Sequence, residues 1–374
     1  MCLPQLVRSR TVDISERRQV GRSELSVTPL GFGGGTIGNP AVTNEESLAT
    51  VSAAWNAGVR FFDTAPWYGV GRSERRLGLG LSGLGDLDEY DINTKIGKTL
   101  VPEAVRDESR KTNSPNGQVK TPRDPITGFR VSFNYSHDAI MTQHHDSLQR
   151  LGHSRVSSLT IHDIDYGYHS AEDIDRHLTE LSRDGGGGAE ALESLRASGA
   201  IKAIGCGCNL ESRNAFSWRD SAHEDLCERI LDTVDLDFFV VAGGYTLLET
   251  RGLRRILPLC ESRNIGVIIA APFSGGWLAD PQNATTYMYA AVPQDVVDRS
   301  LAMADVCGRY NVPLSAVALQ FVLAHPTVAA IIPGAKSILE TEQNRKLVDV
   351  DIPAELWTDL KSSNLLAEEA PTPG

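Results

Sequence analysis

The sequence predicts a single (β/α)8 barrel of the TIM-barrel class, with long loops at the carboxyl ends of its strands. The prediction depends on two observations. Short apolar runs alternate with longer amphipathic segments, strand before helix, eight times along the 374 residues. The alternation has no break at which a second domain would begin, and eight such units close into a barrel. We therefore expect residues 26–374 to form one domain, preceded by an N-terminal arm or hairpin of residues 1–25.

The expected strands are short runs rich in β-branched and aromatic residues. In order along the chain they are SVTPLGF, VRFFD, YDINTKI, VSSLTIH, IKAIGCG, DFFVVAG, GVIIAA and VAAIIPG. The expected helices show apolar residues at helical spacing. In the same order they are EESLATVSAAWN, GRSERRLGLGL, HDAIMTQHHDSLQRL, AEALESLRAS, LCERILDTV, LRRILPLCESR, DVVDRSLAMADVCGRY with PLSAVALQFVLAH, and ILETEQNRKLV.

Three connections are unusually long for a barrel of this kind. They are residues 98–134, 209–224 and 274–295. Each follows a strand and therefore lies on the carboxyl face, where such loops enclose a substrate.

The composition excludes several classes of function. A formal net charge of −12 argues against binding to nucleic acid. No apolar run is long enough to span a bilayer, and the N-terminal segment lacks the apolar core of a secretory signal. Six cysteines without a CxxC pair indicate reduced thiols, so we expect a cytoplasmic protein. No cluster of His, Cys or Asp has metal-ligand spacing, and we expect no metal.

Four polar residues recur at one topological position. Asp63 ends a buried strand, Tyr68 follows in the next loop, and Lys95 and His162 lie at the ends of the next two strands. Each alone has an ordinary alternative, as a helix cap, a surface charge or a core histidine. Together they mark the carboxyl mouth of a parallel barrel, where such folds place their chemistry. We therefore predict an active site there.

The DTA segment with Tyr68, the TKIG and IHD segments and the late IIPGAK segment resemble the aldo-keto reductase superfamily over nearly the whole chain. The resemblance implies that Tyr68 is the general acid or base, that Lys95 and Asp63 tune it, and that His162 orients the substrate oxygen. The chemistry is consistent with these roles, because a nearby ammonium favours the ionised form of a phenol. The neighbouring Trp67 and Asp163 are expected to contact the substrate.

The resemblance also implies a nicotinamide cofactor. It places Tyr245 where the family stacks an aromatic ring on the nicotinamide, with a core tyrosine as the alternative. It places Asn209, in preference to Cys208, at the carboxamide. Many family members carry a glutamine near residues 241–243, and this chain has none there. The glycine-rich loop after the seventh strand is expected to hold the pyrophosphate, through Pro272, Ser274 and Gly276.

The eighth strand and its helix decide the expected choice of cofactor. NADP-preferring relatives place a lysine and an arginine where this chain has Gly334 and Glu340. A carboxylate repels a 2′-phosphate but accepts hydrogen bonds from a ribose hydroxyl. Lys336 would still reach a phosphate, so we predict that NAD is preferred and NADP is possible. Gln343 and Asn344 occupy the positions at which the family contacts the adenine.

The runs APWYGVGRSERRLGLGL and APFSGGWL are most similar to the group containing L-fucose or D-threo-aldose 1-dehydrogenase, L-galactose dehydrogenase and pyridoxal 4-dehydrogenase. This likeness implies oxidation of the anomeric hydroxyl of an aldose to a lactone. The alternatives are an NADPH-linked reductase of aldehydes or ketones, a pyridoxal 4-dehydrogenase, and a regulatory subunit that binds cofactor without turnover. The only partner expected is a small-molecule sugar or aldehyde; the identity of the sugar and the oligomeric state stay open.

Overall fold

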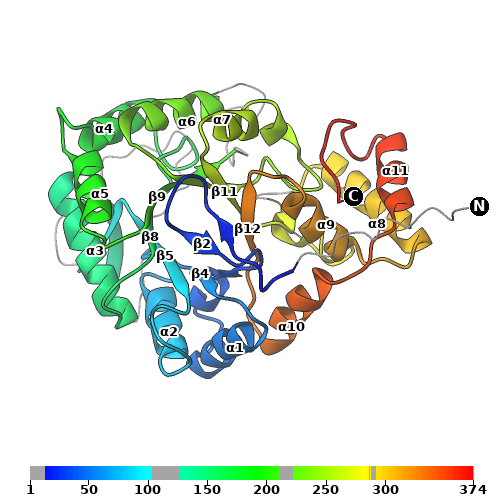
Figure 1. The fold of residues 1–374 in the computed structure, drawn as a ribbon, viewed down its shortest axis with the longest axis horizontal. Helices are drawn as coiled ribbons and strands as arrows, with labels where there is room; N and C mark the ends of the chain where they lie inside the picture. Colours follow the sequence, from blue (N-terminus) through cyan, green and yellow to red (C-terminus); the bar gives the residue numbers. More distant parts are fainter. Residues whose placement is uncertain (1–12, 103–126, 211–221, 286, 288–291, 374) are drawn as a thin grey trace, which may run out of the picture.

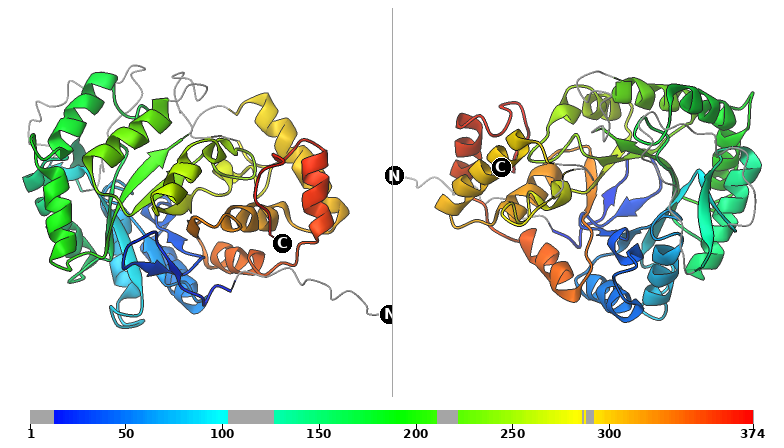
Figure 2. Two further views of the ribbon diagram at one scale, coloured as in Figure 1. Left: turned by 45° about the horizontal axis from the view of Figure 1, so that its top comes forward. Right: turned by 180° about the vertical axis from the view of Figure 1, so that it is seen from behind.

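The computed structural model describes residues 13–102, 127–210, 222–285, 287 and 292–373, apart from the side chain of Cys208. Within these ranges eight parallel strands curve into a nearly closed barrel surrounded by helices (Figures 1 and 2). Isolated bridges from Leu30 to Ile331 and from Gly33 to Gly334 join the two edges of the sheet. The predicted fold is thereby confirmed.

In sheet order the strands are β12 (Val328–Ile332), β11 (Gly266–Ala270), β10 (Phe238–Ala242), β9 (Ala203–Asn209), β8 (Ser158–Ile161), β5 (Asp91–Ile96), β4 (Phe61–Asp63) and β3 (Phe32–Gly33).

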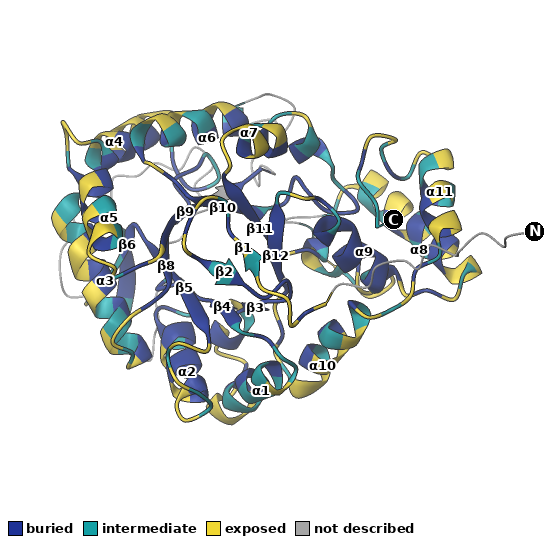
Figure 3. Cartoon of the chain, in the orientation of Figure 1, coloured by how far each residue is buried: buried dark blue, intermediate teal, exposed yellow. Residues whose placement is uncertain are grey.

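Helices pack around the outside of the barrel, and their outer faces carry the exposed residues while the strands are buried (Figure 3). They are α1 (Asn44–Asn56), α2 (Arg72–Leu81), α3 (His137–Leu151), α4 (Ala171–Leu181), α5 (Gly188–Ala197), α6 (Ala222–Thr233), α7 (Ile256–Ser262), α8 (Gln294–Arg309), α9 (Leu314–Leu323), α10 (Ile338–Leu347) and α11 (Ala354–Ser362). Short 3-10 turns cover Thr36–Gly38 (η1), Arg251–Leu253 (η3) and Ser274–Gly276 (η4).

The connection after β5 and the helices α4 and α11 differ from the sequence-based expectation, which included neither helix. The connection after β5, predicted as a loop over residues 98–134, begins and ends as an antiparallel hairpin of β6 (Lys98–Pro102) and β7 (Phe129–Phe133); residues 103–126 lie outside the described ranges. The helix α4 was not predicted, although the Ser170 hydroxyl accepts a bond from the Asp173 N–H as an N-cap. A serine followed by two acidic residues is the local signal that would have indicated this helix.

A second hairpin fills the amino-terminal end of the barrel. Its strands β1 (Arg18–Gln19) and β2 (Ser26–Val27) pair antiparallel and lie at the centre of the ring of strands in Figure 1. Val20 and Leu25 are fully buried and belong to one apolar cluster with inward-facing residues of the barrel, including Phe61 and Phe238. The hairpin therefore acts as the floor of the barrel.

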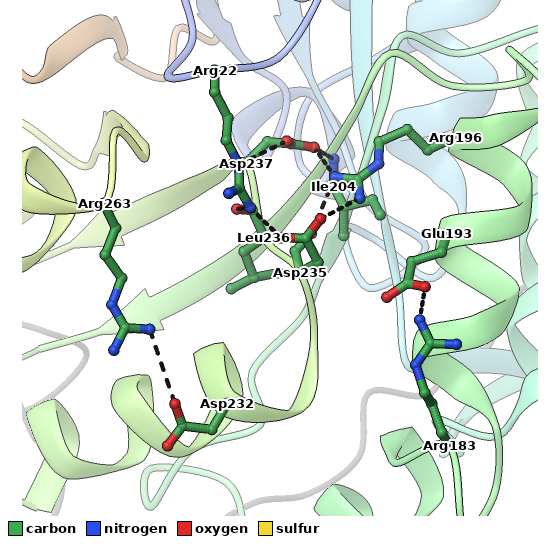
Figure 4. Close-up of polar contacts among 10 residues, drawn as sticks. All are labelled: Arg22, Arg183, Glu193, Arg196, Ile204, Asp232, Asp235, Leu236, Asp237 and Arg263. Carbon is green, nitrogen blue, oxygen red and sulfur yellow. Dashed lines mark hydrogen bonds and ion pairs between the residues drawn. The ribbon is translucent and has the colours of Figure 1, made fainter.

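Charged residues hold the β1–β2 hairpin against the strands and helices of the barrel (Figure 4). The buried carboxylate of Asp237 accepts hydrogen bonds from the N–H of Ile204 and from the guanidinium of Arg196, both at 2.8 Å. Arg196 and Arg22 both pair with Asp235, so α5, the β1–β2 hairpin and the loop before β10 meet at one ionic cluster.

Removal of the buried carboxylate is expected to destabilise the fold. Asp237→Ala leaves the buried N–H of Ile204 without its acceptor, although Arg196 keeps Asp235, and should lower the free energy of unfolding by about 1–3 kcal/mol. The matched control is Arg183→Ala, which breaks a more exposed pair with Glu193 and should cost less than about 1 kcal/mol. Denaturant unfolding of both variants measures the two losses in free energy of unfolding. Equal losses would contradict the role given to Asp237.

Candidate functional site

A buried ion pair lies at the carboxyl ends of β4 and β5. The Lys95 ammonium donates to both carboxylate oxygens of Asp63 at 2.7 Å and to the carbonyl oxygen of Thr64 at 2.8 Å. Both charged side chains are 3% exposed. The sheet register explains the meeting, because Asp63 pairs with Asn93 on β5 and Lys95 projects from the same side of that strand two residues later.

Asn93 braces this ion pair and was not found from the sequence. Its side-chain N–H donates to Asp63 at 2.7 Å, and its oxygen accepts bonds from the hydroxyls of Ser158 and Thr160 on β8. The available signal was the spacing of Asn93 and Lys95, two polar residues on one face of a buried strand. Three neighbouring strands thus hold the carboxylate in a single position.

Tyr68 lies next to the ion pair and is only partly buried. The Lys95 Nζ is 4.8 Å from the centre of the Tyr68 ring, and the rings of Tyr68 and His162 meet edge to face with centroids 5.7 Å apart. The Tyr68 backbone packs closely on η1, where a Cβ atom at Gly38 would lie 2.8 Å from the carbonyl carbon of Tyr68. The structure therefore brings all four predicted reactive residues to one place.

His162 follows β8 and is buried. Its carbonyl oxygen accepts a hydrogen bond from the Tyr135 hydroxyl at 2.7 Å, which anchors the backbone. Its ring nitrogen Nδ1 is 3.3 Å from the ammonium of Lys98. The ring is therefore flanked by Tyr68 on one side and by a second lysine on another.

Lys98 was not predicted as a site residue. It starts β6, is 1% exposed, and forms an ion pair with Asp163. Its Nζ lies 4.0 Å from the centre of the Trp67 ring, with the rings of Tyr168 and Phe133 also nearby. Burial lowers the pKa of Lys98 to about 8, against the opposing attraction of Asp163. Its place three residues after Lys95 was the only sequence signal.

The two residues predicted to contact the substrate lie beside Lys98. Trp67 is partly buried and forms the aromatic wall over the ammonium. Asp163 has a backbone φ of 52°, an uncommon conformation for a residue with a side chain. It is 5% exposed, and its two oxygens accept bonds from Asn209 and Lys98. This packing favours a supporting role for Asp163 over the predicted substrate contact.

Asn209 ends β9 and is held by carboxylates. Its side-chain N–H group donates to Asp163 at 3.0 Å and to Asp165 at 2.6 Å. The amide carbonyl is thereby turned away from both carboxylates, which suits it to accept a bond from a ligand amide. The alternative at this position, Cys208, lies outside the described side chains.

The glycine-rich loop after β11 is a tight turn. Pro272 and Ser274 are buried, and the Ser274 hydroxyl donates to Thr246 at 3.1 Å. The N–H groups of Ser274 and Gly276 donate within the turn, to Ala271 and Phe273, at 3.0 Å. The predicted pyrophosphate contacts would therefore have to come from other N–H groups of this loop.

The packing of Tyr245 favours its alternative role as a core tyrosine over the predicted nicotinamide contact. Its side chain is fully buried, and its ring packs against Phe321 and His325 of the α9 region, with centroids 5.2 and 5.5 Å away. Burial raises the pKa of the Tyr245 phenol. A ring enclosed by the helix layer presents no face to the barrel mouth. This packing fits the alternative of a core tyrosine.

The predicted adenine and ribose contacts gather where β12 meets α10. Gly334, Lys336 and Gln343 are exposed, whereas Asn344 is buried. The Glu340 carboxylate accepts a hydrogen bond from the Lys336 N–H at 2.9 Å and lies 3.6 Å from its ammonium. Glu340 thus neutralises the one lysine that was expected to favour a phosphate.

Metal-binding and membrane-spanning features are both absent from the described part of the chain. No group of three or more His, Cys, Asp or Glu side chains there is arranged to hold a metal ion. No helix among the described residues has the length and apolar character needed to cross a membrane.

Comparison with known proteins gives concordant results for sequence and fold. The model of the Aldo/keto reductase family matches residues 29–365. Pyridoxal 4-dehydrogenase of Microbacterium luteolum is 35% identical over 94% of this chain and 98% of its own. D-threo-aldose 1-dehydrogenase of a Pseudomonas species is 33% identical, over 93% and 96%. The holo form of an aldo-keto reductase from Bacillus halodurans is similar in fold, with a TM-score of 0.65, 22% identity, and coverage of 94% of this chain and 96% of that one.

Proposed function

The chain belongs to the aldo/keto reductase family, and from this premise we propose that it oxidises the anomeric hydroxyl of an aldose to a lactone with NAD. The family, predicted from the motifs, is confirmed, and with it an oxidoreductase acting on CH–OH or carbonyl groups. The observation that carries the finer proposal is the juxtaposition of Tyr68, Lys95 and His162 at the barrel mouth.

Tyr68 is proposed as the group that moves the proton. In oxidation, its phenolate would take the proton of the substrate hydroxyl, and in reduction its phenol would return one. The Lys95 ammonium favours the phenolate, and Asp63 holds that ammonium in place by accepting two of its hydrogen bonds. His162 would donate a ring N–H to the reacting oxygen and so orient it.

The residues at the mouth fit a nicotinamide cofactor, whose chemistry here is to accept a hydride from the substrate carbon. The carbonyl of Asn209 suits the carboxamide, and the rim formed by Gly334, Glu340 and Gln343 suits the adenosine end. The packing of Tyr245 on Phe321 supports a core position for this ring and not the stacking role. No aromatic partner for the nicotinamide ring is therefore assigned.

Two features of the rim support NAD over NADP. A side chain at residue 334 would place its Cβ 2.8 Å from Cγ2 of Thr36, so this position has little room for the lysine of NADP-preferring relatives. Glu340 adds a negative charge and already pairs with Lys336. A 2′-phosphate carries close to two negative charges and needs cations or donors at this point. The rim supplies a carboxylate instead.

Two relatives support the proposed substrate class. One is named for an aldose and the other for pyridoxal. Aldoses close to cyclic hemiacetals, and pyridoxal does so through its neighbouring hydroxymethyl group. Oxidation of the ring-carbon hydroxyl gives a lactone in both cases. Pyridoxal is therefore the second candidate substrate, and it is supported by the 35% identity.

The proposal also includes a location and a partner class. Cys206, Cys260 and Cys307 are buried free thiols, which suits the reducing cytoplasm. The partner proposed is a small-molecule substrate alone, and residues 26–374 are proposed to act as one domain preceded by an arm or hairpin of residues 1–25.

A substrate panel tests the proposal. Free aldoses, pyridoxal and simple aldehydes are assayed with NAD and NADP in both directions. We expect lactone formation from an aldose with NAD, and Tyr68→Phe should lower turnover by at least about 10²-fold with cofactor affinity unchanged. Faster turnover of simple aldehydes with NADPH would favour a reductase. Binding of cofactor without turnover of any compound would favour a regulatory subunit.

Cofactor preference should follow the charge of residue 340. We expect kcat/KM with NAD to exceed that with NADP by about 10²-fold, and Glu340→Arg to shift the ratio towards NADP. The control is Glu340→Gln, which keeps an acceptor for the Lys336 N–H but removes the charge, and it should give an intermediate ratio. A native enzyme that prefers NADP would show that Glu340 does not face the ribose.

A further inference from the structure

We propose that Lys98 is a positioning residue that fixes His162 as a neutral imidazole with its proton on Nε2. The inference rests on the proposed function in one respect, namely that the N–H of His162 serves the reacting oxygen. The placement of the proton itself follows from contacts at Lys98 and is tested without turnover.

The geometry of Lys98 leaves one role for the facing ring nitrogen. The Nζ of Lys98 lies 3.3 Å from Nδ1 of His162. An ammonium has hydrogen-bond donors and no acceptor, so Nδ1 must accept and cannot carry a proton. The only proton of a neutral ring is then on Nε2. The same contact opposes a second proton on the ring, because imidazolium and ammonium would repel each other.

Lys98 acts through His162 and does not reach the substrate. Its side chain is 1% exposed and covered by Trp67, Phe133 and Tyr168. These rings hold the ammonium in place and exclude water from it. Meanwhile the Tyr135 hydroxyl fixes the backbone of His162. Both Lys98 and His162 are therefore held in position by groups other than each other.

Asp163 stabilises the buried ammonium and determines how His162 responds when the lysine is lost. Its Oδ2 pairs with Lys98 and is 3.4 Å from Nε2 of His162. Without Lys98, this carboxylate would face the imidazole alone and would favour its protonation. While Lys98 occupies this oxygen, the Nε2 proton stays available to the reacting oxygen; without Lys98, an imidazolium would donate through Nε2 to Asp163 instead.

Other titratable groups lie near Lys98 and His162 and influence their charges. Asp165 adds a second negative charge near Lys98, whereas Lys95 adds a positive one. His169 packs on Phe133, and the pKa of its imidazole is well below the ordinary value because of burial, so it stays neutral. Tyr68 faces the His162 ring from the mouth. With a pKa of about 8, Lys98 stays largely charged through neutral pH and loses its charge as the pH rises further.

The native protein provides the first test. The full chain is labelled with ¹⁵N-histidine, and His162 is assigned among the nine histidines by comparison with His162→Asn. We expect an Nε2-protonated neutral ring at pH 7 that resists protonation as the pH falls, because the nearby ammonium opposes a second proton. A ring protonated on Nδ1, or an imidazolium at pH 7, would overturn the proposal whatever the enzyme's activity.

Variants of Lys98 provide the second test. Lys98→Met should make His162 titrate at higher pH, move the acid limb of the kcat/KM profile in the same direction, and lower kcat by about 10²-fold without loss of cofactor affinity. Lys98→Arg keeps a charged donor and should restore the tautomer. If Lys98→Met does not fold, Lys98→Gln, which keeps a neutral donor for Asp163, is measured instead and should show the same upward shift. An unchanged His162 titration in a folded variant without the charge would refute the role of Lys98.

Discussion

The buried ion pair between Asp63 and Lys95 is the constraint on which the rest of the site depends. Two charges with 3% exposure have lost most of their hydration, and such a pair is tolerated only when its remaining donors and acceptors are satisfied. Asn93, Thr64 and the hydroxyls of β8 complete that set. Three strands must therefore keep their register for the ammonium to stay beside Tyr68. The barrel acts as the rigid support for one correctly placed positive charge.

The site has one lysine for each reactive side chain. Lys95 lies next to the phenol of Tyr68 and Lys98 next to the imidazole of His162. The two ammonium groups are neutralised by different carboxylates, Asp63 and Asp163, so each is held separately. In the proposed reaction the first favours an ionised phenol and the second a neutral imidazole. Each ammonium thus favours the deprotonated form of the side chain beside it, a phenolate in one case and a neutral imidazole in the other.

Sequence patterns predicted the barrel and brought out its reactive residues because both depend on strand order alone. Asp63, Lys95 and His162 end consecutive strands, and parallel strands end at one edge. Asn93 and Lys98 were missed because their importance arises from contacts across strands, which periodicity does not report. Tyr245 follows its strand as the motif requires, yet Gly243 and Gly244 take positive φ angles and the ring ends in the helix layer. The spacing of residues along the sequence does not predict in which direction a side chain points after a turn of two glycines.

Ionisation of Tyr68 measured directly is the sharpest test of the central claim. The ultraviolet absorbance of tyrosinate is followed against pH for the native protein and for Tyr68→Phe, and their difference isolates Tyr68 from the other tyrosines. The same pair is then measured in the Asp63→Asn/Lys95→Met background, which removes both charges and leaves no unpaired buried carboxylate. We predict that Tyr68 ionises at clearly lower pH in the native background, because the ammonium favours the phenolate. Ionisation at the same pH in both backgrounds would contradict the account.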